Sequence, residues 1–91
     1  MVFVLVTHEV KDYAKWRPFF DSDLESQKKA GRIGAPQVFQ DATNPSKITL
    51  LFEWDSKVNV EKFMSNPKMK EIMDKAGVIS QPVATYLNKK N

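Results

Sequence analysis

The sequence contains no cysteine, one histidine, only three glycines and no long apolar run. The absence of cysteine excludes disulfides, thiolate metal sites and the small secreted folds that depend on disulfide bonds. One histidine excludes a metal site built from several histidines of one chain. The apolar start, MVFVLV, ends by Thr7 and is too short for a signal peptide or a membrane span. We therefore expect a cytoplasmic protein without membrane contact.

Catalytic motifs of fixed spacing are also missing. No HExxH, no GxSxG and no glycine-rich phosphate loop occurs in the sequence. The net charge of +3 comes from the second half of the chain, residues 46–91, where Glu61, Glu71 and Asp74 lie between the lysines. A nucleic-acid surface would need a stripe of basic residues with aromatic residues between them. We expect no nucleic-acid partner, no metal and no cofactor.

Four segments have the composition of β-strands. They are rich in β-branched and apolar residues and are bounded by turn residues, as strands usually are. The four segments are residues 2–10, 35–41, 47–54 and 82–88.

Two further regions have helical periodicity. Asp12 is a candidate N-cap for a helix over residues 13–30, with Gly31 as its end. A second helical region starts at Asp55-Ser56, pauses at residues 65–67 and ends at Gly77. Within that pause, an asparagine followed by proline is a common start for a new helical segment.

The order βαββαβ predicts an α+β, ferredoxin-like fold in one domain over residues 1–91. Right-handed crossovers would make a four-stranded antiparallel sheet with two helices on one face. The first strand would lie in the middle of the sheet, between the third and the fourth.

The central strands are apolar on both sides. In the first strand Val4 and Val6 point one way, whereas Phe3 and Leu5 point the other way. Helices can cover one face only, so the second face would be an exposed apolar patch that needs a partner. We expect a homodimer formed sheet against sheet.

Three stretches, VTHEVKDYAKW, ITLLFEWDS and FMSNPKMKEIMDKAGV, resemble the dimeric α+β barrel superfamily. The resemblance is closest to its small antibiotic-biosynthesis-monooxygenase-like branch, many members of which are uncharacterised. It implies two sheets packed into a barrel and one pocket per subunit, between sheet and helices. Relatives include cofactor-free oxygenases of aromatic substrates, haem-degrading enzymes, isomerases and proteins without known activity. The haem-degrading relatives carry a histidine ligand after the serine/asparagine-proline turn. This chain reads PKMKEIM there and has no histidine at that place.

His8 is the candidate catalytic residue. Strand parity places it on the helix-covered side with Val4 and Val6, near the start of the first helix. Three interpretations are open: a structural histidine bonded to backbone, a polar contact for a ligand, or a general base. The residues predicted to line a pocket around it are Tyr13, Trp16, Leu50, Phe52, Met69 and Met73.

Two functions from different classes follow from these observations. The first is a small-molecule-binding protein with a hydrophobic, aromatic-lined pocket for a small aromatic or hydrophobic ligand. Whether it only binds this ligand or is also a cofactor-free monooxygenase-like or cyclase-like enzyme stays open. The second is a non-catalytic dimeric structural or interaction module whose pocket is filled by its own side chains. A pocket of roughly 300 Å³ or more beside His8 would favour the first function.

Overall fold

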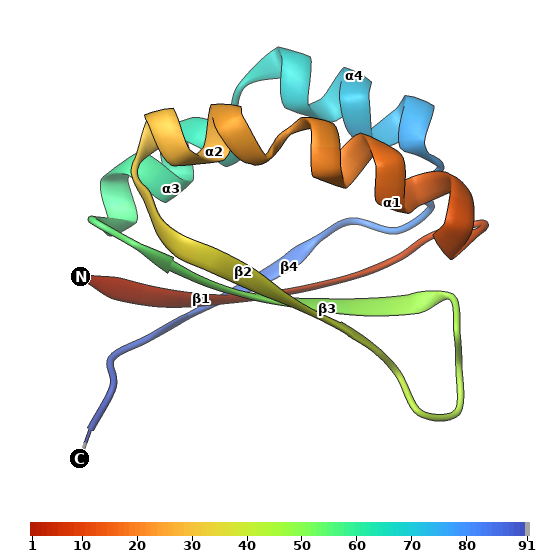
Figure 1. Cartoon of the computed structure of the whole chain (residues 1–91), viewed down its shortest axis with the longest axis horizontal. Helices are drawn as coiled ribbons and strands as arrows, with labels where there is room; N and C mark the ends of the chain where they lie inside the picture. Colours follow the sequence, from red (N-terminus) through yellow and green to blue (C-terminus); the bar gives the residue numbers. More distant parts are fainter. Residues whose placement is uncertain (91) are drawn as a thin grey trace.

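A twisted antiparallel sheet of four strands carries all the helices on one face, in a computed structural model that describes residues 1–90 (Figure 1). The strand order β2-β3-β1-β4 places β1 between β3 and β4, as the sequence predicts. The elements are β1 (Val2–Glu9), α1 (Tyr13–Ser22), α2 (Leu24–Ala30), β2 (Arg32–Gln40), β3 (Lys47–Trp54), α3 (Lys57–Met64), α4 (Pro67–Ala76) and β4 (Val83–Leu87).

Each predicted helical region consists of two helices. The Asp12 side chain caps α1 by accepting from the backbone N–H of Ala14 at 2.9 Å. The expected single helix over residues 13–30 is interrupted at Asp23, whose N–H donates to the carbonyl of Phe20 at 3.1 Å. A bond that spans three residues tightens the last turn and ends α1 there.

The second helical region follows its predicted signals. The Asn66 side chain accepts from the N–H of Lys68 at 3.0 Å, and Pro67 is the first residue of α4. Gly77 ends α4 in the left-handed conformation, with φ of 86°.

The second strand begins earlier than the predicted residues 35–41. Arg32 already pairs with Trp54, and a bulge lies between Ile33 and Gln37. Gly34 lies within this bulge with a positive φ of 66°, a conformation that costs glycine little. The strand ends before Asp41, whose carboxylate accepts from the backbone N–H groups of the following turn.

The buried core lies between the sheet and the helices. On the helix-covered side of β1, Val4, Val6 and His8 alternate with less buried neighbours, as strand parity predicts. Ile48 and Trp54 of β3 are buried on the same side. In residues 1–90, no helix is both long enough and apolar enough to cross a membrane.

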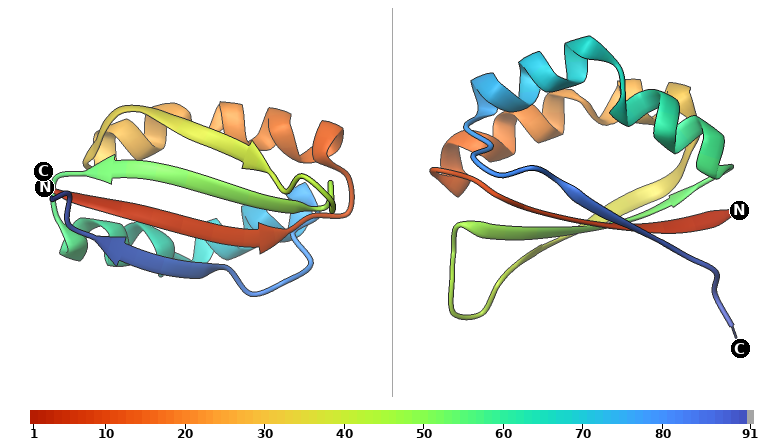
Figure 2. Two further views of the ribbon diagram at one scale, coloured as in Figure 1. Left: turned by 90° about the horizontal axis from the view of Figure 1, so that it is seen from below. Right: turned by 180° about the vertical axis from the view of Figure 1, so that it is seen from behind.

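No helix or strand of residues 1–90 covers the opposite face of the sheet (Figure 2). Register pairs Leu5 with Leu51 and Phe3 with Leu87 on this face. Phe39 and Val83 also lie on it and are 48% and 64% exposed. Large apolar side chains therefore face solvent across all four strands.

Candidate functional site

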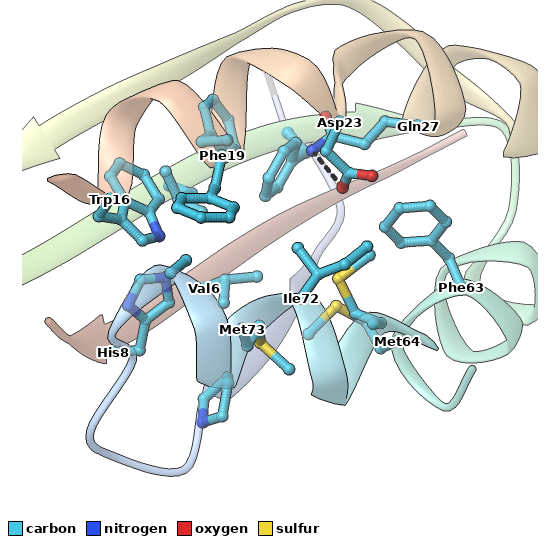
Figure 3. Close-up of a pocket in the computed structure, with 16 residues that line it drawn as sticks. Val6, His8, Trp16, Phe19, Asp23, Gln27, Phe63, Met64, Ile72 and Met73 are labelled. Carbon is cyan, nitrogen blue, oxygen red and sulfur yellow. Dashed lines mark hydrogen bonds between the residues drawn. The ribbon is translucent and has the colours of Figure 1, made fainter. Parts of the chain in front are cut away.

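A narrow cavity of about 70 Å³ lies between the sheet and the four helices (Figure 3). It is bordered by β1 and β3 on the sheet side and by side chains of α1, α2, α3 and α4 on the other side. Its apolar lining consists of Val6, Trp16, Phe19, Phe20, Leu50, Phe52, Phe63, Met64, Met69, Ile72, Met73, Ala76 and Pro82. The lining has three polar members, which are His8, Asp23 and Gln27.

His8 is 5% exposed and forms one end of the lining. Its ring meets that of Trp16 edge to face, with the ring centroids 5.5 Å apart. Nδ1 is buried and has no hydrogen-bond partner within residues 1–90. The interpretation of His8 as a structural histidine bonded to the backbone therefore does not hold for Nδ1. A buried polar atom without a hydrogen-bond partner lowers the stability of the fold.

Burial lowers the pKa of His8 below its ordinary value of 6.5, because the charged imidazolium loses its hydration. The imidazole is therefore neutral near pH 7. A neutral imidazole has one nitrogen with a lone pair and one with a proton, so it can either accept a proton from a ligand or donate a hydrogen bond to it.

The same pKa shift predicts that acid destabilises the fold through His8. Between the lowered pKa and 6.5, the unfolded chain binds more protons than the folded chain, so stability falls as the pH falls through this interval. We expect the urea midpoint to decrease between about pH 7.5 and pH 5.5. Replacing the chain's one histidine, His8→Phe, should remove most of that decrease. If the urea midpoint of His8→Phe depended on pH as strongly as that of the unmodified protein, His8 would not be the group responsible for the decrease.

The second polar group of the lining is the pair Asp23–Gln27, at the other end of the cavity from His8 (Figure 3). Gln27 Nε2 donates to Asp23 Oδ2 at 3.4 Å. Gln27 is 4% exposed, and its Oε1 has no partner among the described residues. Burial raises the pKa of the Asp23 carboxyl, and the hydrogen bond from Gln27 opposes this shift.

No protein-family model and no curated protein matches this chain. Solved structures, however, resemble it over nearly its whole length. A protein from Bordetella bronchiseptica described as an antibiotic biosynthesis monooxygenase superposes with a TM-score of 0.81 at 14% identity, covering 99% of this chain and 97% of that chain. A protein of the same description from Caulobacter crescentus gives a TM-score of 0.71 at 20% identity, covering 99% and 90%.

A variant of SnoaB, a cofactor-independent oxygenase from Streptomyces nogalater, gives a TM-score of 0.72 at 8% identity, covering 99% of this chain and 93% of that chain. This chain has the antibiotic biosynthesis monooxygenase fold. At these identities the likeness concerns the fold, and the site has to be argued from the residues of this chain.

Most of the residues that the sequence predicts for the site lie together around the cavity. The cavity lining includes His8, Trp16, Leu50, Phe52, Met69 and Met73. Tyr13 lies outside the lining. Its ring packs on Trp16 with centroids 5.8 Å apart, and its hydroxyl accepts from Arg17 at 3.1 Å. Tyr13 thus supports the wall formed by Trp16.

Sequence reasoning did not nominate Phe19, Asp23, Gln27, Phe63 or Pro82, all of which line the cavity. One signal for Gln27 was available. It lies seven residues after Phe20 on the buried stripe of the helical region, so a polar side chain interrupts an apolar face.

The part of the chain that the structure describes contains no candidate metal centre. No group of three or more His, Cys, Asp or Glu side chains is placed there to hold a metal ion.

A second hollow, a groove of about 500 Å³, adjoins the cavity. The groove runs between α4 and the segment of residues 78–82 that leads into β4. Met64, Met73 and Pro82 line both the cavity and the groove, so these three side chains separate the two spaces. Methionine side chains are unbranched and adapt easily to new packing.

Proposed function

We propose that the chain binds a small aromatic molecule in the cavity and oxygenates it without a cofactor. The observation that carries this proposal is the buried Nδ1 of His8, which has no hydrogen-bond partner in residues 1–90 and belongs to a side chain that lines a cavity with aromatic walls. A polar atom held in such a cavity is suited to meet a polar group of a ligand. The shared fold with a cofactor-independent oxygenase supports the reaction class.

In the proposed reaction the substrate supplies the electrons for dioxygen. His8 removes a proton from an acidic C–H carbon between aromatic rings, and the carbanion transfers one electron to dioxygen. The two radicals combine into a peroxide anion at that carbon, and the imidazolium of His8 returns its proton to the outer peroxide oxygen. The resulting hydroperoxide loses its remaining C–H proton and hydroxide as water, which breaks the O–O bond and leaves a carbonyl. For anthrone, C14H10O and O2 become anthraquinone, C14H8O2, and H2O. The chain contributes the base, the orientation between aromatic walls and the exclusion of water.

The cavity has to widen for such a substrate. Its volume of about 70 Å³ is below the roughly 300 Å³ at which pockets for drug-sized ligands begin. We propose that Met64 and Met73 move aside, so that the ligand enters from the groove and occupies part of both spaces. Side-chain movements of this kind are common on ligand binding, while the backbone stays nearly in place.

We expect anthrone at ten times its dissociation constant to stabilise the fold by about 1.4 kcal/mol, which is a rise of several degrees in melting temperature. Met73→Trp, which fills the passage between cavity and groove, should abolish the rise. Lys68→Trp introduces the same side chain on the exposed side of α4 and should preserve it. Thermal shift measurements on the three proteins check this. Equal shifts in all three would contradict entry past Met73.

The small volume also favours a second candidate, a non-catalytic module whose cavity is filled by its own side chains. No stabilisation of the unmodified protein by anthrone or by naphthols would support this candidate over the oxygenase.

We further propose that two copies pack through the uncovered sheet face into a homodimer. The support is the apolar surface on that face, to which Phe39, Val83 and Leu87 contribute side chains 41% to 64% exposed. Exposed apolar patches of this extent are typical of interfaces. Because the cavity lies on the opposite side of the sheet, each copy would keep its own site.

A further inference from the structure

The side-chain amide of Gln27 is only half satisfied, because Nε2 donates to Asp23 while Oε1 has no partner in residues 1–90. The residue is 4% exposed and lines a cavity whose walls are apolar except for His8 and Asp23 (Figure 3). Its Oε1 is buried without a partner in residues 1–90. Leaving such an acceptor unpaired is unfavourable, and an apolar side chain of similar shape would avoid this cost.

The orientation of the Gln27 amide follows from its neighbour. Asp23 Oδ2 lies 3.4 Å from Nε2, and an ionised carboxylate can only accept hydrogen bonds. The nitrogen end of the amide therefore faces Asp23, and the carbonyl oxygen remains free for another donor. Oε1 and the carboxylate of Asp23 together offer acceptors at one end of the cavity.

His8 and this pair lie at opposite ends of the cavity, with aromatic side chains between them (Figure 3). A flat apolar ligand that reaches from one end to the other would meet polar protein atoms at its two ends only. A ligand hydroxyl that donates to Gln27 Oε1 would form a hydrogen bond and would remove the free-energy cost of leaving this oxygen unpaired.

We propose that Gln27 and Asp23 form an accepting subsite that selects aromatic ligands with a hydroxyl group at the end remote from His8. The inference rests on the proposed binding of an aromatic ligand in this cavity and specifies which ligands are bound. In it, Gln27 is a specificity-determining residue, and His8 acts on the other end of the ligand.

The test compares 2-naphthol with 2,6-dihydroxynaphthalene, which differ by one hydroxyl, by isothermal titration calorimetry. We expect the unmodified protein to bind 2,6-dihydroxynaphthalene on the order of tenfold more tightly than 2-naphthol, which corresponds to a difference in binding free energy of about 1.4 kcal/mol. Gln27→Met should bring the preference down to about the statistical twofold of a symmetric ligand and leave the affinity for 2-naphthol nearly unchanged. Ser26→Met places the same side chain on the exposed side of α2 and should retain the preference.

The outcomes separate the subsite from the proposed function. If both probes bind but Gln27→Met keeps the preference, the subsite is overturned and ligand binding in the cavity stands. If neither probe binds the unmodified protein, the proposed function is overturned and the subsite with it.

The melting temperature gives an independent readout of the subsite. Gln27→Met removes the unpaired Oε1 and also the hydrogen bond to Asp23, so we expect these two effects to offset each other and the melting temperature to change little. A lower melting temperature together with an equal loss of affinity for both probes would show that Gln27 is structural and would overturn the inference.

Discussion

Leu51→Asp is expected to convert the proposed homodimer into monomers. Leu51 pairs with Leu5 of β1 at the middle of the uncovered sheet face, where a sheet-to-sheet contact would bury it. A carboxylate buried there without a partner loses its hydration at a cost of several kcal/mol, which is more than most interfaces tolerate. Sedimentation velocity at micromolar concentration should show the halved mass, and Leu5→Asp should act in the same way.

Ser26→Asp is the matched control for this charge. It adds the same carboxylate to the exposed side of α2, away from the sheet, and should leave the sedimentation coefficient unchanged. Because the uncovered face carries none of the buried core, Leu51→Asp monomers should also keep the helical circular dichroism. If the unmodified protein sediments as a monomer at micromolar concentration, the proposed dimer is wrong.

His8→Phe is expected to reduce kcat/KM for the oxidation of anthrone by about 10²- to 10⁴-fold, the usual contribution of a general base. The phenyl ring can keep the edge contact with Trp16 but has no nitrogen to take the proton. In the unmodified protein the rate should rise with pH through the pKa of His8, which lies below 6.5, and should level off near neutral pH. Anthraquinone formation, corrected for the uncatalysed reaction, measures this rate.

His8→Gln distinguishes a base from a polar contact. A glutamine can hydrogen-bond a ligand but does not take up a proton near pH 7. Loss of turnover with retained binding of 2-naphthol would assign the proton transfer to His8. Turnover of anthrone by His8→Gln at the unmodified rate would refute the role as base, and no turnover by the unmodified protein would refute the oxygenase itself.

Local sequence patterns determined the order of elements and most of their ends. Asp12, Asn66 and Gly77 act on backbone groups within a few residues, so the caps that they form are encoded in short stretches. The alternation of β1 likewise places Val4, Val6 and His8 on the helix side, because side chains of a strand alternate whatever lies around it.

The break at Asp23 was decided by the tertiary structure. The apolar spacing from Trp16 to Phe20 and beyond is compatible with one continuous helix or with two. Two short helices follow the curvature of the twisted sheet below them (Figure 1). The packing of both helices against the sheet overrides the weak local preference for continuing the helix.

The shape of the site was likewise decided by side chains that come from separate segments. Whether Tyr13 or Gln27 lines the cavity depends on how α1 and α2 rotate over β1 and β3, and the volume of about 70 Å³ depends on how Met64 and Met73 fill the remaining space. A periodic pattern specifies the buried side of each helix but not the rotamers that close or leave a gap between helices and sheet. The sequence by itself therefore determined which faces meet, and only the tertiary packing decided which polar atoms are left without partners in the space between them.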